Sequence, residues 1–155
     1  MPSVAHGHVT LEAGTASAGT YKAVLQVGHG CEGSPTTAIR VQIPEGVIAV
    51  KPMPKPGWQL ETVSAPYARA YDHYGEQISE GVKEVVWSGG DLPDPFYDEF
   101  VFRVRLPDAA PGTVIHFPVV QECAEGTHRW IEIPEAGQDP EMLEEPAPSV
   151  TLTAE

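Results

Sequence analysis

The chain has 155 residues, 41% of them hydrophobic, and a formal net charge of −13 at neutral pH. The hydrophobic content excludes a disordered chain, and the length suits one domain. The acidic excess argues against nucleic-acid binding, which needs Lys and Arg to contact phosphates. No apolar run reaches the roughly 18 residues of a membrane-spanning helix. We therefore expect one folded domain with no membrane span in this chain, and a charge compatible with handling cations.

Residues 1–7 read MPSVAHG and precede the first strand-like pattern. Small residues suit signal-peptidase cleavage after Ala5 or after Gly7, which would leave His6 or His8 as the first residue. We expect residues 1–7 to be a signal-peptide remnant or an added leader, and residues 8–155 to form a single domain. The expected location is periplasmic or exported.

Alternating apolar and polar residues predict about nine short strands. They are expected, in chain order, near residues 8–12, 20–27, 36–43, 46–52, 58–63, 82–90, 99–106, 113–121 and 127–133, followed by a last strand through Val150 and Leu152. Asp139 and Pro140 suit the cap and first position of one short helical turn near the C-terminus. The pattern predicts an all-β fold, a two-sheet sandwich of immunoglobulin or cupredoxin type.

A proline-rich segment and a single proline predict interruptions in these strands. KPMPKPGW, residues 51–58, is expected at a sheet edge or in a crossing loop, because proline cannot donate to a strand ladder. Pro118 predicts a bulge or an edge position within residues 113–121 for the same reason.

The two cysteines predict one structural disulfide. Cys31 lies in HGCEGSP and Cys123 in QECAEG, both read as turns, and the chain has no CxxC motif. A bond between them would close a loop of about 90 residues and stabilise the fold by roughly 4–5 kcal/mol in the chain-entropy model. It would also indicate an oxidising compartment.

Common catalytic motifs are missing from the sequence, so we expect no enzymatic activity. It has no G-x-S-x-G, no H-E-x-x-H and no phosphate-binding glycine loop, and its six histidines form no zinc spacing. His116 lies within a strand and is typical of a packed or surface imidazole. An oxidative copper enzyme remains an alternative, in which His116 or His128 would have to supply a second histidine ligand.

A histidine at the start of a mature chain offers two nitrogens, the α-amine and the ring. The pKa of about 7.7–8 of a terminal amine lets a metal compete with the proton at neutral pH. Such a nitrogen pair with an oxygen suits Cu(II), which heads the divalent affinity order. If the chain begins at His6, HGH gives a more flexible Cu(II) chelate. The alternative is that His6 and His8 are exposed polar residues near a terminus.

Several blocks of the sequence resemble, in order, those of the YcnI-like family of exported bacterial proteins. They are HVTLEAGTASAGTYKAVLQVGHGCEGSPTTAIRVQIPEGV, KPMPKPGW, VVWSGGDLPD, YDEFVFRVRLP, FPVVQECAEGTHRWIEIP and EEPAPSV, and they span residues 8–152. The resemblance implies a β-sandwich associated with copper homeostasis, whose mature chain starts at His8.

The resemblance also implies a mono-histidine brace that holds one Cu(II) per chain. The ligands would be the amine and ring of His8 with a carboxylate, and Trp130 of HRWIEI would lie beside the metal. Glu99 is the chosen carboxylate because the EF of YDEFVF matches a recurrent motif of the family. Its rivals Glu122, Glu125 and Glu132 flank Trp130, whereas Trp58 and Trp87 are expected in the core.

Retained residues 1–7 would convert the His8 amine into an amide and remove one nitrogen from the brace, and His6 could then capture metal instead. The expected function is copper storage, trafficking or homeostasis, with a periplasmic copper chaperone or a copper-transport membrane protein as partner. The alternative is a metal-independent module that binds a protein or a glycan, with KPMPKPGW as its exposed feature.

Overall fold

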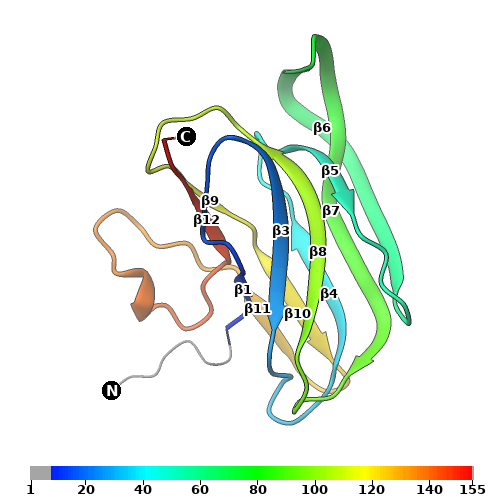
Figure 1. Cartoon of the computed structure of the whole chain (residues 1–155). Helices are drawn as coiled ribbons and strands as arrows, with labels where there is room; N and C mark the ends of the chain where they lie inside the picture. The colour runs from blue at the N-terminus through cyan, green and yellow to red at the C-terminus, as the bar shows by residue number, and fades with distance from the viewer. Residues whose placement is uncertain (1–7, 155) are drawn as a thin grey trace.

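The structure, a computed structural model, describes residues 8–154, whose regular secondary structure consists of strands and one 3₁₀ turn (Figure 1). A front sheet has the order β1 (Thr10–Leu11), β3 (Gly19–Val27), β8 (Asp98–Leu106), β5 (Ile48–Pro52). A back sheet has the order β11 (Thr127–Trp130), β10 (Val119–Cys123), β4 (Thr36–Gln42), β7 (Glu76–Leu92), β6 (Gln59–His73). A small third sheet has the order β2 (Thr15–Ala16), β12 (Ser149–Leu152), β9 (Val114–His116). The predicted all-β sandwich is confirmed, and residues 8–154 form twelve strands where about nine were expected.

The core lies between the front and back sheets. The residues that the alternation pattern turns inward are buried: Tyr21, Ala23, Leu25 and Val27 on β3, and Phe100, Phe102, Val104 and Leu106 on β8. Trp87 of β7 is fully buried against Phe100 and Phe102, with ring centroids 5.5 and 6.4 Å apart. Its predicted place in the core is therefore confirmed.

The segment around Pro118 passes from one sheet to another. β9 ends at His116 in the small sheet, and β10 begins at Val119 in the back sheet. Pro118 has no N–H to continue a ladder, so the predicted interruption occurs here. The single strand expected over residues 113–121 is consequently two strands.

Strands β6 and β7 form a much longer hairpin than the pattern predicted, and it extends beyond the sandwich (Figure 1). The chain reverses at Tyr74 and Gly75, whose φ angles are 53° and 86°. Two positive φ values in a two-residue loop are the type I′ geometry that matches strand twist. Most side chains of the extension are exposed, so no one-sided apolar alternation marked it in the sequence.

KPMPKPGW follows the front sheet at its outer edge. β5 ends at Pro52 as an edge strand, in agreement with the prediction for this segment. Trp58 turns back onto the sandwich, where its ring meets Phe100 edge-on with centroids 5.0 Å apart. Trp58 is half-buried, so it packs at the margin of the core and not in its centre.

The C-terminal segment forms a 3₁₀ turn, η1 (Pro140–Met142), and then strand β12. The Asp139 carboxylate accepts a hydrogen bond of 3.0 Å from the Glu141 amide, which confirms the predicted cap. Val150 and Leu152 of β12 are buried, as expected. Over residues 8–154 no helix has the length and apolar character to cross a membrane.

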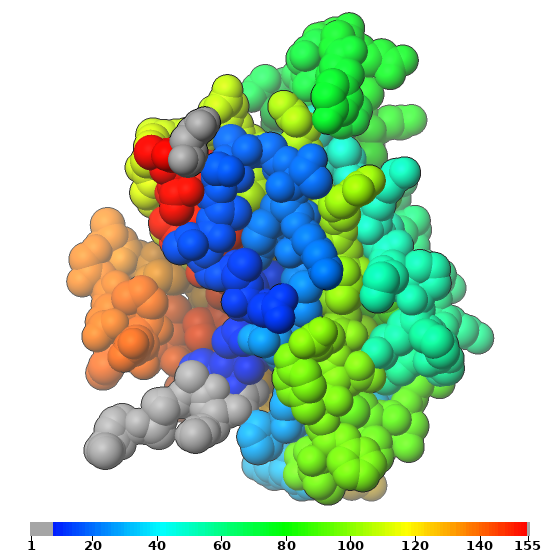
Figure 2. All heavy atoms as spheres, viewed as in Figure 1, coloured from blue at the N-terminus to red at the C-terminus, as the bar shows by residue number. Residues whose placement is uncertain are grey.

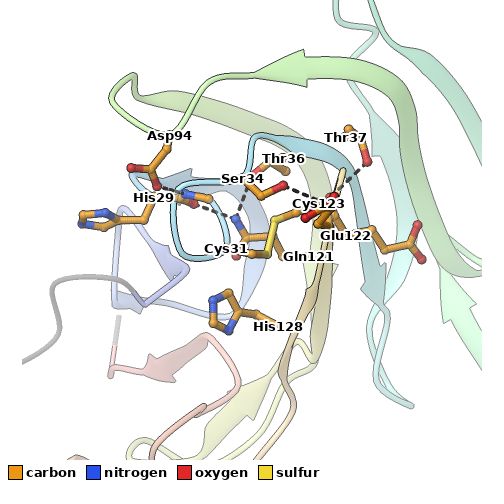
Figure 3. The surroundings of a disulfide bond; sticks show 12 residues. His29, Cys31, Ser34, Thr36, Thr37, Asp94, Gln121, Glu122, Cys123 and His128 are labelled. Carbon is orange, nitrogen blue, oxygen red and sulfur yellow. Dashed lines mark hydrogen bonds between the residues drawn. A yellow bond between two sulfur atoms is a disulfide. The ribbon is translucent and has the colours of Figure 1, made fainter.

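Cys31 and Cys123 form the predicted disulfide, with an S–S distance of 2.04 Å and a sequence separation of 92 (Figure 3). The bond ties the loop after β3 in the front sheet to the end of β10 in the back sheet. It therefore fastens the two sheets together at one end of the sandwich.

Candidate metal centre

His8 and Trp130 are in contact although they lie 122 positions apart in the sequence. His8 lies two residues before the short edge strand β1 and is half-buried, and Val9 between them is buried in the core. Trp130 ends β11 in the other sheet and is only 3% exposed. The centroids of the two rings are 5.3 Å apart and the rings are tilted by 59°. The structure thus brings together two of the three residues predicted for the brace.

Buried hydrogen bonds fix the orientation of the Trp130 indole. Its Nε1–H donates to Gln121 Oε1 at 3.0 Å, and Gln121 is fully buried on β10. Gln121 Nε2 donates in turn to the His29 carbonyl at 2.7 Å and to Thr36 Oγ1 at 2.8 Å. Figure 3 shows Gln121 beside this loop and the disulfide. A buried amide with all these partners holds one conformation, so the indole is positioned before any ligand arrives.

A second imidazole lies on the indole. The His128 ring centroid is 4.9 Å from that of Trp130, and His128 Nδ1 lies 2.7 Å from Glu145 Oε2. Glu145 Oε1 also accepts from the Arg129 amide at 3.2 Å, so its carboxylate is held in place. Glu145 was not predicted as a site residue; its only sequence signal was its place in the EEPAPSV block.

Glu99, the predicted carboxylate ligand, lies across the front sheet from β1. In the register Thr10 pairs with Gln26 and Gln26 with Glu99, which puts the Thr10 and Glu99 Cα atoms about 10 Å apart at the usual strand spacing. Glu99 Oε2 accepts a hydrogen bond from the Tyr97 hydroxyl at 2.8 Å. The structure does not bring Glu99 to the His8–Trp130 contact, and its ligand role stays a prediction.

Two of the three rival carboxylates have other partners, and the third is exposed in a turn. Glu122 forms an ion pair with Arg40, with 2.8 Å between Oε2 and Nε. Glu132 Oε1 accepts from the Glu145 amide at 3.0 Å, and Glu125 is exposed in the turn after β10. Among residues 8–154, no three His, Cys, Asp or Glu side chains are grouped so that they could hold a metal ion.

His29 is a further imidazole at this end that the sequence analysis did not select. Because Thr10 pairs with Gln26 in the antiparallel β1–β3 ladder, continuing the register puts His8 opposite Gly28, directly before His29. His29 is exposed, and its carbonyl is the one that Gln121 holds. His29 lies two residues after the end of β3, and no sequence pattern placed it near His8 before the strand register was known. His6, the other histidine proposed as a ligand, lies outside the described residues.

A groove of about 890 Å³ opens beside His8, between β1 and the segment that carries η1. Its walls include Val9, Leu11, His116, Leu143 and Pro146 and are mostly apolar. Burial lowers the pKa of His116, which favours the neutral imidazole there. His116 is thus half-buried at the groove, consistent with the packed or surface histidine expected from the sequence.

Replacing Trp130 by phenylalanine tests whether the indole nitrogen is structurally important. The change leaves Gln121 Oε1 buried without its donor, and we expect it to lower the free energy of unfolding by about 1–3 kcal/mol. Urea unfolding measures the loss. Trp58→Phe is the matched control, because the Trp58 ring is half-buried and its replacement leaves no buried acceptor without a donor. Equal losses of unfolding free energy in the two variants would contradict the role of the hydrogen bond.

Comparison with known proteins agrees with this fold. The profile of a family of domains of unknown function, DUF1775, matches residues 8–152. The solved structure of an uncharacterized protein from Nocardia farcinica with an immunoglobulin-like fold is 28% identical, covers 95% of this chain and 99% of that chain, and has a TM-score of 0.67. A Corynebacterium diphtheriae structure is 11% identical and covers 96% of this chain and 34% of that chain, with a TM-score of 0.41. No curated protein matches the sequence at a significant level.

Proposed function

The chain belongs to the DUF1775 family, and from that premise we propose that it is an exported protein that binds one Cu(II) ion at His8. The α-amine and the ring nitrogen of His8 bind the ion once His8 is the first residue, and a carboxylate supplies an oxygen. Two nitrogens from one residue with an oxygen are the donor set that Cu(II) prefers. The resemblance to the YcnI-like proteins supports copper as the metal.

The observation that supports the site best is the contact between His8 and Trp130. A ring centroid distance of 5.3 Å restricts the His8 imidazole on one side. The Trp130 indole is itself held by buried Gln121. Because a chelate gains affinity when its ligands are oriented beforehand, a fixed indole beside His8 favours metal binding.

The surroundings of the site suit a protein that holds a cation and passes it on. The net charge of −13 raises the local concentration of cations. The disulfide between Cys31 and Cys123 is typical of an oxidising compartment, which agrees with export. The donor or acceptor would be a periplasmic copper chaperone or a copper-transport membrane protein. We propose that the protein stores or transfers copper without catalysis. The copper-loaded protein is therefore expected not to form peroxide when ascorbate is added.

Calorimetric titration of protein that begins at His8 tests the proposal. We expect one saturable Cu(II) site, an electron paramagnetic resonance spectrum with at least two nitrogen ligands, and quenching of tryptophan fluorescence that is reduced in Trp130→Phe. Absence of saturable binding would refute the proposal.

Two glutamate variants identify the oxygen ligand. If Glu99 is the ligand, Glu99→Gln weakens Cu(II) binding and Glu145→Gln does not; if the carboxylate near Trp130 moves onto the metal, the reverse holds. Glu122→Gln is the matched control, because its carboxylate is paired with Arg40.

A further inference from the structure

Basic side chains gather on the outward face of the front sheet, although the chain as a whole is strongly acidic. The sequence has nine Lys and Arg residues. Five of them lie on this face or at its border with the β6–β7 hairpin: Lys22, Lys51, Arg69, Arg103 and Arg105. We call these five residues the basic face. In Figure 2, β3 (blue) and β8 (yellow-green) lie side by side toward the viewer, with the green hairpin rising above them.

Three of these cations form a row across three strands. Lys22 of β3 pairs with Arg103 of β8, and Lys51 of β5 pairs with the same Arg103 from the other side. All three side chains are exposed. Arg105 lies two residues further along β8 and therefore on the same face. Like charges directly opposite one another destabilise a sheet, so this arrangement is unfavourable for the protein alone.

The protein does not neutralise these charges internally. Arg40, Lys55 and Lys83 each have a carboxylate oxygen within 4.0 Å. None of the basic face residues has such a partner within residues 8–154.

Carboxylates lie at the margins of the basic face. The exposed Glu12 continues the β1–β3 pairing opposite Val24, two residues from Lys22. Asp72 and Asp108 line a hollow of about 680 Å³ that Arg69 and Arg105 also line. Glu99 lies four residues before Arg103 on β8, about 13 Å away along the strand. The central row therefore presents its positive charge to whatever lies above the sheet.

An exposed aromatic residue borders the basic face. Tyr74, at the turn of the β6–β7 hairpin, is 82% exposed, and the Arg105 guanidinium lies 5.6 Å from the centroid of its ring. Tyrosine has an apolar ring and a polar tip and is enriched at membrane–water interfaces. An exposed tyrosine beside unpaired cations is the combination that suits a headgroup layer.

We propose that the basic face docks onto membranes that contain anionic phospholipids, with Tyr74 entering the headgroup region. The face is a sheet surface three strands wide, which can contact several lipid phosphates at once. Arginine binds phosphate oxygens through two parallel N–H groups. Because the rest of the chain is acidic, an anionic membrane repels it, so the protein docks with the front sheet toward the lipid.

Sedimentation with lipid vesicles tests the proposal at low and at physiological salt. The protein binds vesicles containing phosphatidylglycerol and not vesicles of phosphatidylcholine alone, and salt weakens the binding. Lys22→Gln/Lys51→Gln lowers the partition coefficient about 25-fold, at about fivefold per cation. The control Arg40→Gln/Arg129→Gln changes the net charge equally but on the back sheet, and it lowers binding less than about twofold.

Three results would overturn the proposal. They are equal binding to the two kinds of vesicle, an equal loss in the two double variants, and binding to soluble polyglutamate with the same sensitivity to Lys22 and Lys51 but not to vesicles. The last result would make an acidic protein the partner. Retained secondary structure of each variant, measured by circular dichroism, separates these outcomes from misfolding.

Discussion

His8→Ala, in protein that begins at residue 8, will lower the affinity for Cu(II) by more than about 100-fold. Loss of a partner that only orients a metal ligand already costs 10–100-fold, and this change removes a ligating ring nitrogen outright. The change leaves the core intact, because the His8 side chain lies outside it next to Trp130. Competition against a chelator of known affinity measures the change, and circular dichroism confirms the fold.

Protein that keeps residues 1–7 provides the complementary test of the same site. Its His8 nitrogen is an amide, so the amine–imidazole chelate cannot form, and we expect a loss of affinity comparable to that of His8→Ala. The leader-bearing protein should also be tested as His6→Ala, because His6 can bind copper by itself. If leader-bearing protein with His6→Ala binds Cu(II) as tightly as protein that begins at His8, a brace at His8 is excluded.

Removing the disulfide with Cys31→Ala/Cys123→Ala will lower the free energy of unfolding by about 2–5 kcal/mol. The bond spans 92 residues and joins the loop after β3 to the end of β10, so the unfolded chain gains much freedom without it. Urea unfolding of the oxidised protein and the double variant measures the difference. A loss below about 1 kcal/mol would show that the sheets hold this end together without the bond.

The same variant links stability to the candidate site. Gln121 lies two residues before Cys123 and bonds both to Trp130 and to the His29 carbonyl in the cysteine-bearing loop. We therefore expect weaker Cu(II) binding in the double variant even at temperatures where it is folded. The control Gly112→Ala lies in a distant turn at a positive φ of 94°, so it destabilises the fold without touching the site.

The inward faces of the strands were predictable because apolar and polar residues alternate along them. On β8, Phe100 and Phe102 are fully buried while Arg103 is exposed. On β3 the alternation breaks at Val24, which is buried although it lies between the inward-facing Ala23 and Leu25. The disulfide and the η1 cap were also predictable, since each rests on local residue types. The β6–β7 extension was not, because a ribbon exposed on both faces carries no one-sided apolar pattern.

The candidate site was only partly predictable, because it depends on register. His8 and Trp130 were selected from motifs, and the structure brings them into contact. Glu145 and His29 reach the same end only through the pairing of strands and the path of the η1 segment, which no local pattern encodes. Likewise, the row formed by Lys22, Arg103 and Lys51 exists only because three strands align in one register.

Strand β1 is paired with β3 at only two residues, Thr10 and Leu11, and lies at the edge of its sheet. The buried side chains of Val9 and Leu11 add to this anchorage, but so short an edge segment opens locally at a lower free energy than the whole sandwich does. Whatever His8 holds under the proposed function is therefore attached to a segment that can open before the sandwich does. A receiving protein could peel away a few residues and take the cargo while the two sheets and their crosslink stay closed.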